Sequence, residues 1–409
     1  MNTPPPKSQR DRQSTPSKPV ILPNELITEI LSWLPVKYLM QMKCVSKSWN
    51  NLISDPKFVQ LHLNRSARNP YFSSVVSNHH DDDDNDDDYS FIHFPVNRLL
   101  ENRYISISND PYYQLNDKDC CYEVVGSCNG LICLIGYPKN EIVYKTMWLC
   151  FWNPATRKIS DKLGSDYHYN VKYTWKYSKF VFGYDNSTDT YKVVAVSQTD
   201  NNDPQSKTKV RVFSLGDNIW RTIQGFPVVP LQVFIKSMGC DLDGVHLNCT
   251  VNWMANQSDL TNDYVIISLD LCTEKYTQML LPQGLEYDPH VLPSVCVLND
   301  SLCLYRDFKR TDFVIWKMKE FGDDKSWIQF LKFSYNNIRM NYKLGHRPII
   351  KLTPLHLSED GETLVFANNL QDRAILYNRR TNRLRKTRIN NKICWFSIKH
   401  YVESLVSTS

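Results

Sequence analysis

From residue 70 to the end of the 409-residue chain, helical periodicity is absent, and this constrains the fold more than any other feature of the sequence. Short runs of β-branched and aromatic residues recur there between clusters of Asn, Asp, Gly, Pro and Ser, a pattern typical of strands separated by turns. An aromatic content of 12%, with 23 Tyr and 10 Trp, favours strands as well. We predict an all-β region, either a sandwich or a propeller. Its clearest strands are expected at residues 131–135, 147–152, 191–196, 210–215, 264–269, 295–298, 313–318, 364–367 and 374–377.

A recurring turn pattern favours the propeller over the sandwich. Each copy has Asn or Asp after a strand, then two residues, then Thr, so that the Asn or Asp side chain can hydrogen-bond the backbone two residues on. The copies are Asn153–Thr156, Asp185–Thr188, Asp270–Thr273 and Asn378–Thr381. One strand-turn unit each near residues 153, 215, 270, 317 and 378 gives intervals of about 47 to 62 residues, a little longer than the roughly 40–50 of typical blades. About six blades would fit between Cys120 and the C-terminus, and unrelated hairpins in a sandwich remain the alternative.

The segment Leu22–Ile53 has a different pattern, which predicts short helices. Pro23 can occupy a first helical position, and Glu25 suits the positive end of the helix dipole. Pro35 ends this first helix. Between these residues, apolar side chains recur with helical spacing at Leu26, Ile27, Ile30, Leu31 and Leu34.

Two more short helices are expected around Leu39 and Trp49, and Phe58–Leu63 offers one or two further turns after the break at Asp55-Pro56. Of the 32 residues in Leu22–Ile53, 17 are apolar. A unit of roughly 40 residues is at the limit of independent folding and cannot bury so many apolar side chains by itself. We therefore expect an exposed apolar surface on which a partner protein docks.

The same segment resembles the F-box over about 40 residues, with the spacing kept throughout. The matching residues are Leu22-Pro23, Glu25, Glu29 to Leu31, Leu34 to Lys37, Leu39, Lys43 to Lys47, Trp49, Leu52-Ile53 and Pro56 to Phe58. The resemblance implies docking to a Skp-type adaptor, which joins an F-box protein to a cullin scaffold. The residues expected to contact or shape this interface are Leu22, Pro23, Leu26, Ile30, Leu34, Pro35, Leu39, Val45 and Trp49. A helical hairpin that merely caps the next domain is the alternative.

The β-rich region resembles the plant F-box-associated domain, which follows an F-box in a large plant family that is often described as kelch-like and includes the S-locus F-box proteins. The matching stretches are Gly126–Leu134, Phe151–Lys158, Phe182–Asp185 with Asp189–Val194, and Gly244–Asn248 with Val251–Trp253. Adjacent Gly-Gly, the kelch hallmark, is absent from a chain that has only 13 Gly, so we expect a propeller-like domain and not a kelch domain. Cys249 stands where the family more often has Gly, and this turn is expected to differ.

Together these patterns predict a multidomain chain, helical first and then all-β. The expected divisions are a disordered tail over 1–19, a three-helix F-box over 20–65, variable strands with an acidic loop (79–88) over 70–118, and a propeller-like domain over 119–405. No apolar stretch approaches the roughly 18 residues of a membrane span, and the N-terminus lacks the apolar core of a signal peptide. The 12 Cys include no CxxC pair, so we expect them reduced and mostly buried, in the cytoplasm, the nucleus or both.

Three charged stretches could carry chemistry, but each has a simpler interpretation. The acidic run Asp81–Asp88 lacks the alternating ligands and the Gly of a Ca²⁺ loop, which favours a solvated loop. The basic stretch Arg379–Arg388 could be a nuclear signal or bind phosphate, and Tyr173–Lys179 could bind nucleic acid, yet exposed hairpin faces account for both. Motifs for a nucleophile elbow, a phosphate-binding loop, HExxH and GxGxxG are absent from the sequence, so we expect no catalytic residues, metal or cofactor.

The two resemblances imply a substrate-recognition subunit of a Skp–cullin–F-box (SCF) ubiquitin ligase that performs no bond chemistry itself. The F-box would attach the protein to the ligase, and the β domain would capture an unidentified target protein for ubiquitination. Three alternatives stay open: an adaptor-binding or scaffolding protein without a degradation target, a propeller enzyme, and a nucleic-acid binder that uses the Arg-rich stretch.

Overall fold

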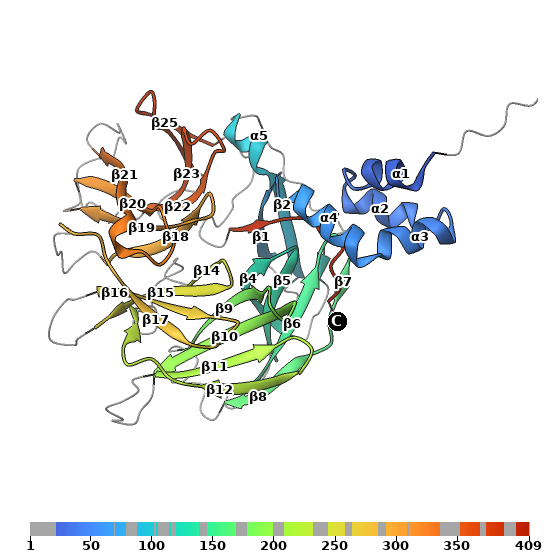
Figure 1. Cartoon of the computed structure of the whole chain (residues 1–409), viewed down its shortest axis with the longest axis horizontal. Helices are drawn as coiled ribbons and strands as arrows, with labels where there is room; N and C mark the ends of the chain where they lie inside the picture. The colour runs from blue at the N-terminus through green and yellow to red at the C-terminus, as the bar shows by residue number, and fades with distance from the viewer. Residues whose placement is uncertain are drawn as a thin grey trace, which may run out of the picture.

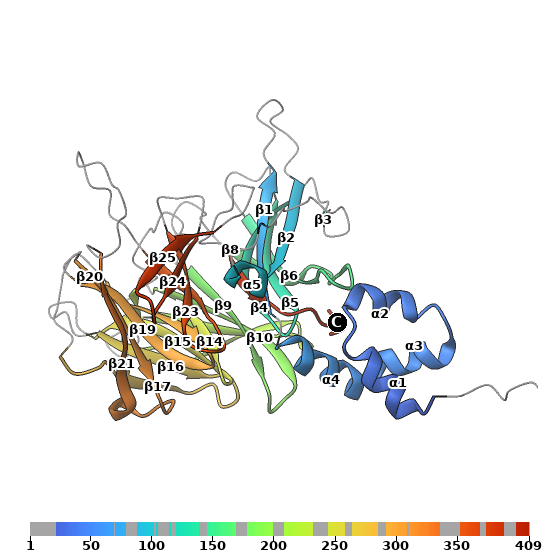
Figure 2. The same ribbon diagram turned by 90° about the horizontal axis from the view of Figure 1, so that it is seen from above.

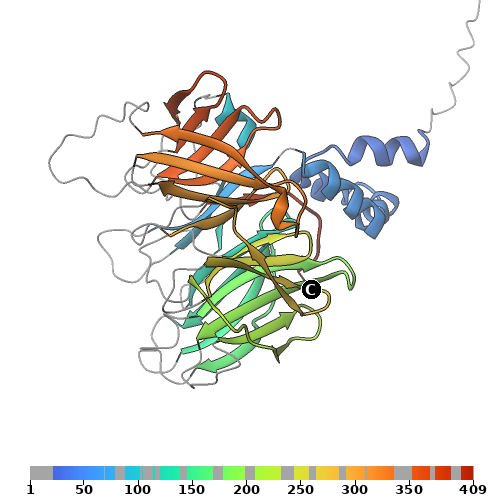
Figure 3. The ribbon, with the colours of Figure 1, turned by 60° about the vertical axis from the view of Figure 1, so that its left-hand side comes forward.

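A computed structural model describes residues 22–68, 70–78, 88–101, 104, 114–115, 120–138, 145–168, 178–198, 208–231, 244–257, 264–284, 292–308, 311–335, 352–368, 374–387 and 398–408. These residues form a helical unit over 22–68 and, after it, a ring of β-sheets (Figure 1). Figure 3 shows the helical unit beside one side of the ring. The helical unit followed by an all-β unit confirms the predicted fold class.

The helical unit contains α1 (Asn24–Leu31), α2 (Val36–Met42), α3 (Lys47–Ser54) and α4 (Pro56–Ser66). Ser46 caps α3, because its Oγ accepts a hydrogen bond from the Trp49 amide at 3.2 Å. Asp55 caps α4 in the same way and accepts from the Lys57 amide at 2.8 Å. We expected only one or two helical turns after α3, but α4 has 11 residues. Asp55 and Pro56 end α3 and also start α4, because Asp caps a helix well and Pro fits its first position.

Six antiparallel sheets in the described part of the chain form the blades of a propeller, and five of them follow one another in sequence. The first comprises β4 (Cys120–Cys128), β5 (Leu131–Pro138), β6 (Lys145–Asn153) and a divided fourth strand, β7 (Lys158–Ile159) with β8 (Leu163–His168). The second comprises β9 (Ser178–Asp185), β10 (Thr190–Gln198), β11 (Thr208–Ser214) and β12 (Ile219–Ile223). The third has a divided first strand, β13 (Val229–Pro230) with β14 (Val245–Leu247), followed by β15 (Thr250–Asn256), β16 (Tyr264–Asp270) and β17 (Tyr276–Leu280).

The fourth blade comprises β18 (Ser294–Leu298), β19 (Ser301–Phe308), β20 (Asp312–Met318) and β21 (Trp327–Ser334). The fifth comprises β22 (Leu352–Leu357), β23 (Thr363–Asn368), β24 (Ile375–Asn378) and β25 (Arg383–Lys386). Neighbouring blades meet through their first strands, since β4 contacts β9 and β26, β14 contacts β9 and β18, and β18 contacts β22. All nine strands predicted from the sequence occur, with bounds that differ by a few residues.

The sixth blade is assembled from both ends of the β region. Its strands, in order across the sheet, are β26 (Lys399–Tyr401), β1 (Tyr71–Asn78), β2 (Asp88–Pro95) and β3 (Gln114–Leu115), with the short helix α5 (Val96–Leu100) after β2. Tyr71 pairs with Tyr401, and Ser73 pairs with Lys399. The strands expected over 70–118 are thus part of the propeller, and a boundary at residue 119 does not separate two units. Local patterns could not reveal this, because the partner of β1 lies about 330 residues further along the chain.

The predicted Asn/Asp turns have the expected hydrogen bonds. Asp270 Oδ1 accepts from the amides of Cys272 and Thr273, both at 2.8 Å. Asn378 Oδ1 accepts from the amide and the hydroxyl of Thr381, also at 2.8 Å. These side chains fix the turn within four residues, so the pattern is visible in the sequence.

The position of the turns in the blades corrects one part of the repeat. The units near 153, 215, 270, 317 and 378 each join the third strand of a blade to its fourth, one per blade. Asp185 instead ends β9, the first strand of the second blade, so its turn belongs to another position of the repeat. The same Asx chemistry serves both positions, and the local sequence does not distinguish them.

Turn length distinguishes the two faces of the propeller. Because neighbouring strands are antiparallel, the first-to-second and third-to-fourth turns share one face, which we call the short-turn face. Two-residue turns on this face include 129–130, 248–249 and 299–300. Cys249 has a φ of +61° in such a turn, a left-handed conformation that Gly adopts more easily. On the opposite face, described strands are joined through longer connections such as 199–207 and 336–351, which lie outside the described residues.

Buried apolar side chains fill the spaces between adjacent blades. Between the fourth and fifth blades, the fully buried Phe313 packs against the rings of Tyr305, Phe333 and Phe366, with centroid distances of 6.0, 5.4 and 5.4 Å. Aromatic rings in such tilted, stacked and edge-on arrangements contribute beyond the area that they bury. This cluster therefore holds two neighbouring blades together.

A buried ion pair connects the second blade with the third. Lys192 Nζ lies 3.0 Å from Asp185 Oδ2 in its own blade and 3.4 Å from Glu274 Oε1 in the next. Burial alone would raise the pKa of Asp185, but hydrogen bonds from Ser187, Cys272 and Lys192 outweigh it and hold this pKa well below its ordinary value. The charges are thus compensated inside the protein, which is the condition for burying them.

We expect Phe313→Ala to lower the free energy of unfolding by about 3–5 kcal/mol, because it leaves a cavity among packed rings. Ile219→Ala is the control, since Ile219 is 60% exposed on β12 and its loss should cost within about 0.5 kcal/mol. Urea unfolding of both variants measures the difference. Equal losses would contradict the role given to the cluster.

Candidate functional site

Two apolar stripes run along α1. Ile27, Leu31 and Leu34 face inward and pack with the core of the helical unit. Leu26, Ile30 and Trp33 lie one position earlier, at the same spacing of four and three residues, and are 50%, 57% and 54% exposed. The single apolar face expected from the sequence is therefore two adjacent faces, of which one packs inward and the other is exposed.

The outward stripe continues into a wider surface, which we call the apolar docking surface. It adds Leu22, Tyr38 and Val45, which are 48%, 51% and 64% exposed. Exposed apolar surface of this kind on a small helical unit marks a site of protein interaction.

The nine residues predicted for adaptor binding fall into three groups. Six are exposed: Leu22, Pro23, Leu26, Ile30, Pro35 and Val45. Leu34 and Trp49 are partly buried in the core of the helical unit, and Leu39 is fully buried there, so that it can shape the surface only from beneath. Trp33 and Tyr38 were not predicted, although Trp33 continues the spacing of Leu26 and Ile30 past the end of α1. Contact of these residues with an adaptor stays a prediction.

Arg65 of α4 holds the outward stripe in place. Its Nη2 lies 2.6 Å from Glu29 Oε2 and its Nη1 donates to the Glu29 carbonyl oxygen at 3.0 Å. The guanidinium also lies 4.7 Å from the centre of the Trp33 ring, a cation–π contact. The hydrogen bond from Arg65 lowers the pKa of Glu29. One side chain thus fixes both the end of α1 and the exposed indole.

His62 of α4 supports the chain just before Pro35. Its Nε2 lies 2.9 Å from the carbonyl oxygen of Leu34, which can only accept, so this nitrogen carries the proton. The Nδ1 atom then accepts from the Ser66 hydroxyl at 3.4 Å. The side chain is 1% exposed, and this burial lowers its pKa. The neutral imidazole is therefore the form that fits the folded helical unit.

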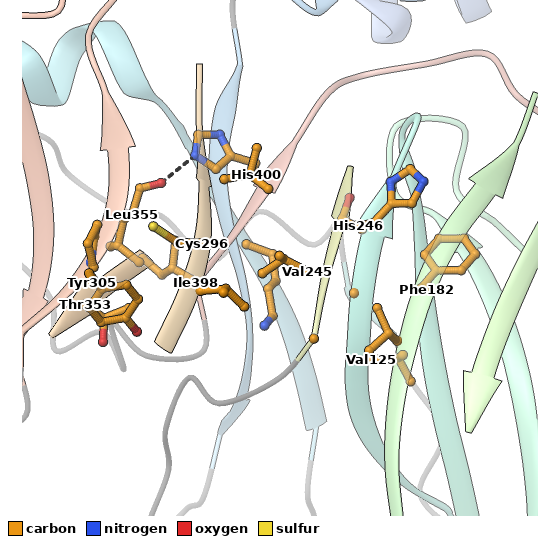
Figure 4. Close-up of a pocket in the computed structure, with 18 residues that line it drawn as sticks. Val125, Phe182, Val245, His246, Cys296, Tyr305, Thr353, Leu355, Ile398 and His400 are labelled. Atoms are coloured by element: carbon orange, nitrogen blue, oxygen red, sulfur yellow. Dashed lines mark hydrogen bonds between the residues drawn. The ribbon is translucent and has the colours of Figure 1, made fainter. Parts of the chain in front are cut away.

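A cavity of about 270 Å³ lies where the first strands of all six blades converge (Figure 4). Its lining is mixed, with valines from β4, β9, β14 and β18 beside polar groups. The polar side chains are those of Ser127, His246, Tyr305, Thr353, Lys399 and His400.

The two histidines of the cavity connect neighbouring blades. They lie on opposite sides of the cavity (Figure 4). His400 Nε2 donates to the Leu355 carbonyl oxygen at 2.8 Å, and His246 Nε2 accepts from the Tyr184 amide at 3.2 Å. Burial lowers the pKa of His246, which keeps it a neutral acceptor. Burial also raises the pKa of Cys296 well above its ordinary value, so this group is a thiol and not a thiolate nucleophile.

The other candidate stretches have structural positions only in part. Residues 81–87 of the acidic run, residues 173–177 of the stretch Tyr173–Lys179, and Arg388 lie outside the described residues. Arg379 packs 4.0 Å from the Phe330 ring and donates to the Gly361 carbonyl oxygen at 2.8 Å, while Arg380, Arg383, Arg385 and Lys386 are exposed on the β24–β25 hairpin.

The part of the chain that the structure describes contains neither a grouped metal site nor a membrane-spanning helix. Among these residues, no three His, Cys, Asp or Glu side chains are grouped as metal ligands. None of the helices that the structure describes has the length and apolar character to cross a bilayer. None of the nine cysteines whose side chains the structure describes forms a disulfide bond, and Cys133, Cys150, Cys296 and Cys303, which we predicted to be buried, are buried.

Comparison with protein families decides the identity of both units. The family model of the F-box domain matches residues 21–61, and that of the F-box associated beta propeller domain matches residues 87–408. The chain is a plant F-box protein. It belongs to the family in which the F-box is followed by an F-box-associated β-propeller, as the resemblances in the sequence implied.

Relatives of this F-box protein occur in Arabidopsis thaliana. An F-box/kelch-repeat protein is 30% identical over 324 residues, which cover 76% of this chain and 79% of the relative. The F-box protein CPR1 is 26% identical over 330 residues, covering 75% and 72% of the two chains. Among solved structures, an α-L-arabinofuranosidase of Fusarium graminearum is similar over 74% of this chain and 89% of its own, with 8% identity and a TM-score of 0.39. A likeness this weak carries no information about function.

Acidification should destabilise the F-box through His62. The folded-state pKa is below the unfolded value near 6.5, so the unfolded chain binds the proton more readily. This contribution to stability is present above about pH 6.5 and is lost as the pH falls towards the folded pKa, at no more than about 1.4 kcal/mol per pH unit for one group. Other histidines titrate too, so the test is the difference between the wild type and His62→Gln, which keeps a donor for Leu34. Denaturation at about pH 7.5 and about pH 5.5 should show a smaller acid loss in the variant, and equal losses would contradict the assignment.

Proposed function

We propose that this F-box protein is the substrate-recognition subunit of an SCF-type ubiquitin ligase. Its F-box binds a Skp-type adaptor through the apolar docking surface, and its propeller captures a target protein. The observation that supports this most strongly is the exposure of six large apolar side chains on the F-box, each at least 48% exposed with the propeller in place. An exposed apolar surface of this kind is available to a partner.

The layout of the propeller supports the second half of the proposal. The F-box precedes β1, which starts on the short-turn face, so the F-box is attached on that side. The longer connections leave the described strands on the opposite face, and recognition commonly resides in such connections on a rigid scaffold. We assign target capture to that opposite face. The target would then be held beside the ubiquitin-charged enzyme, and proximity would speed transfer to its lysines, with no bond chemistry by this chain.

Adaptor binding is the first test. We expect Leu26→Ala with Ile30→Ala to weaken binding to a plant Skp-type adaptor by about 30- to 1000-fold, because well-placed apolar residues at interfaces contribute about 1–2 kcal/mol each. Both side chains are exposed in the chain alone, so their removal should not disturb the fold. Calorimetric titration with the full chain measures the effect. Leu34 is a poorer choice for this test, since it is partly buried and its carbonyl holds His62.

The matched control removes equal apolar side chains elsewhere. Ile219→Ala with Leu280→Ala alters two residues that are each 60% exposed on the propeller, and this variant should bind the adaptor as the wild type does. A folded wild type that does not bind any adaptor tested would refute the proposal. Equal weakening by the two double variants would refute the assignment of the docking surface.

A further inference from the structure

The segment that follows β26, Val402–Thr408, lies between the F-box and the first blade. In both Figure 1 and Figure 2 the end of the chain is seen beside the F-box helices and the first blade. Glu403 is 8% exposed and Ser404 is fully buried, unlike the residues of a solvated tail. The segment therefore has protein on more than one side.

Two side chains of this segment belong to the F-box. Glu403 Oε2 accepts a hydrogen bond from the Val36 amide at 3.1 Å, in a buried position. Val36 begins α2, and Pro35 before it provides no side-chain cap, so Glu403 satisfies an amide that the helix itself cannot. Leu405 is partly buried and packs against the F-box core, on the cluster that contains Leu31 and Leu39.

The neighbouring residues of the segment belong to the propeller. Asn153, at the end of β6 and fully buried, donates from Nδ2 to the carbonyl oxygens of Ser404 at 3.0 Å and Val406 at 2.9 Å. Val406 packs on the core between the first and second blades. At Gly130, in the β4–β5 turn, a Cβ atom would clash with Ser404, so the close approach of the segment needs a glycine there.

We infer that Val402–Thr408 is a strap that locks the F-box to the propeller, with Glu403 and Leu405 as positioning residues on the F-box side and Asn153 as the anchor on the propeller side. The contacts alternate along the segment, so it cannot detach from one unit without losing its place on the other. The orientation of the two units is thereby fixed. What this orientation means for ubiquitin transfer rests on the proposed function, whereas the existence of the strap does not depend on that function.

A pair of lysines reports this orientation directly. Burial and, second to it, the charge of Lys158 on β7 lower the pKa of Lys43, which lies at the end of α2. The two amines therefore lie near each other across the junction of the units. A short amine-reactive cross-linker should join them in the wild type.

Hydrogen exchange of the full chain, without any partner, tests the strap. In Glu403→Ala the Val36 amide loses its acceptor, and exchange in peptides that cover α2 should become about 10- to 100-fold faster, as expected when a buried amide is left without an acceptor. Glu403→Gln is the matched control, because its amide oxygen keeps the acceptor while the buried charge is removed. It should exchange as slowly as the wild type. Burial raises the pKa of Glu403, which agrees with a neutral side chain being tolerated there.

Leu405→Ala provides a second, independent variant. It should speed exchange in all four F-box helices and lower the Lys43–Lys158 cross-link yield at least twofold, while peptides from the distant β20 stay unchanged. Wild-type exchange and cross-linking in both Glu403→Ala and Leu405→Ala would overturn the strap, and so would acceleration in Glu403→Gln equal to that in Glu403→Ala. Since none of these measurements includes an adaptor, a chain that fails to bind one would refute the proposed function without affecting this result.

Discussion

Backbone hydrogen bonds between β26 and β1 place the last strand of the propeller beside its first, and the other parts of the molecule follow from this pairing. β26 is the innermost strand of the sixth blade. This strand and the residue before it line the cavity through Ile398, Lys399 and His400. The entropic cost of closing such a loop grows only with the logarithm of its length, by about 0.6 kcal/mol for each doubling, so the large separation is affordable. Because the F-box leads into β1 and the strap leads out of β26, closure also brings these two segments to the same place.

The features that could be predicted from sequence are those whose interactions are local. The Asn/Asp turns depend on hydrogen bonds within four residues, and the predicted strands are short apolar runs with turns on both sides. The role of β1 to β3 as part of the sixth blade could not be predicted, because no local sequence feature indicates that β1 pairs with β26. The roles of Glu403 and Leu405 could not be predicted for the same reason. Their contacts are with the F-box, more than 300 residues earlier in the chain, and form only in the folded protein.

The predicted adaptor-binding residues show a subtler limit. A helix with apolar residues at two adjacent positions per turn has a wide apolar arc, and the pattern does not say which edge of the arc is covered. In α1 the ion pair between Arg65 and Glu29 and the burial of Leu31 decide which apolar side chains face inward and which stay exposed. Leu39 is covered by its neighbours, whereas Trp33 and Tyr38, outside the prediction, are open. The division depends on α4, which the sequence indicated only as one or two turns.

The strap has a consequence for the order in which the protein is made. Synthesis proceeds from the N-terminus, and N-terminal domains generally fold first. Here the F-box emerges early, but the acceptor for the Val36 amide and the Leu405 side chain of its core are added only after every blade has been synthesised. A chain released before that point carries an F-box without its contacts to Glu403 and Leu405 and a propeller without the inner strand of its sixth blade. Completion of the F-box is thus tied to completion of the propeller.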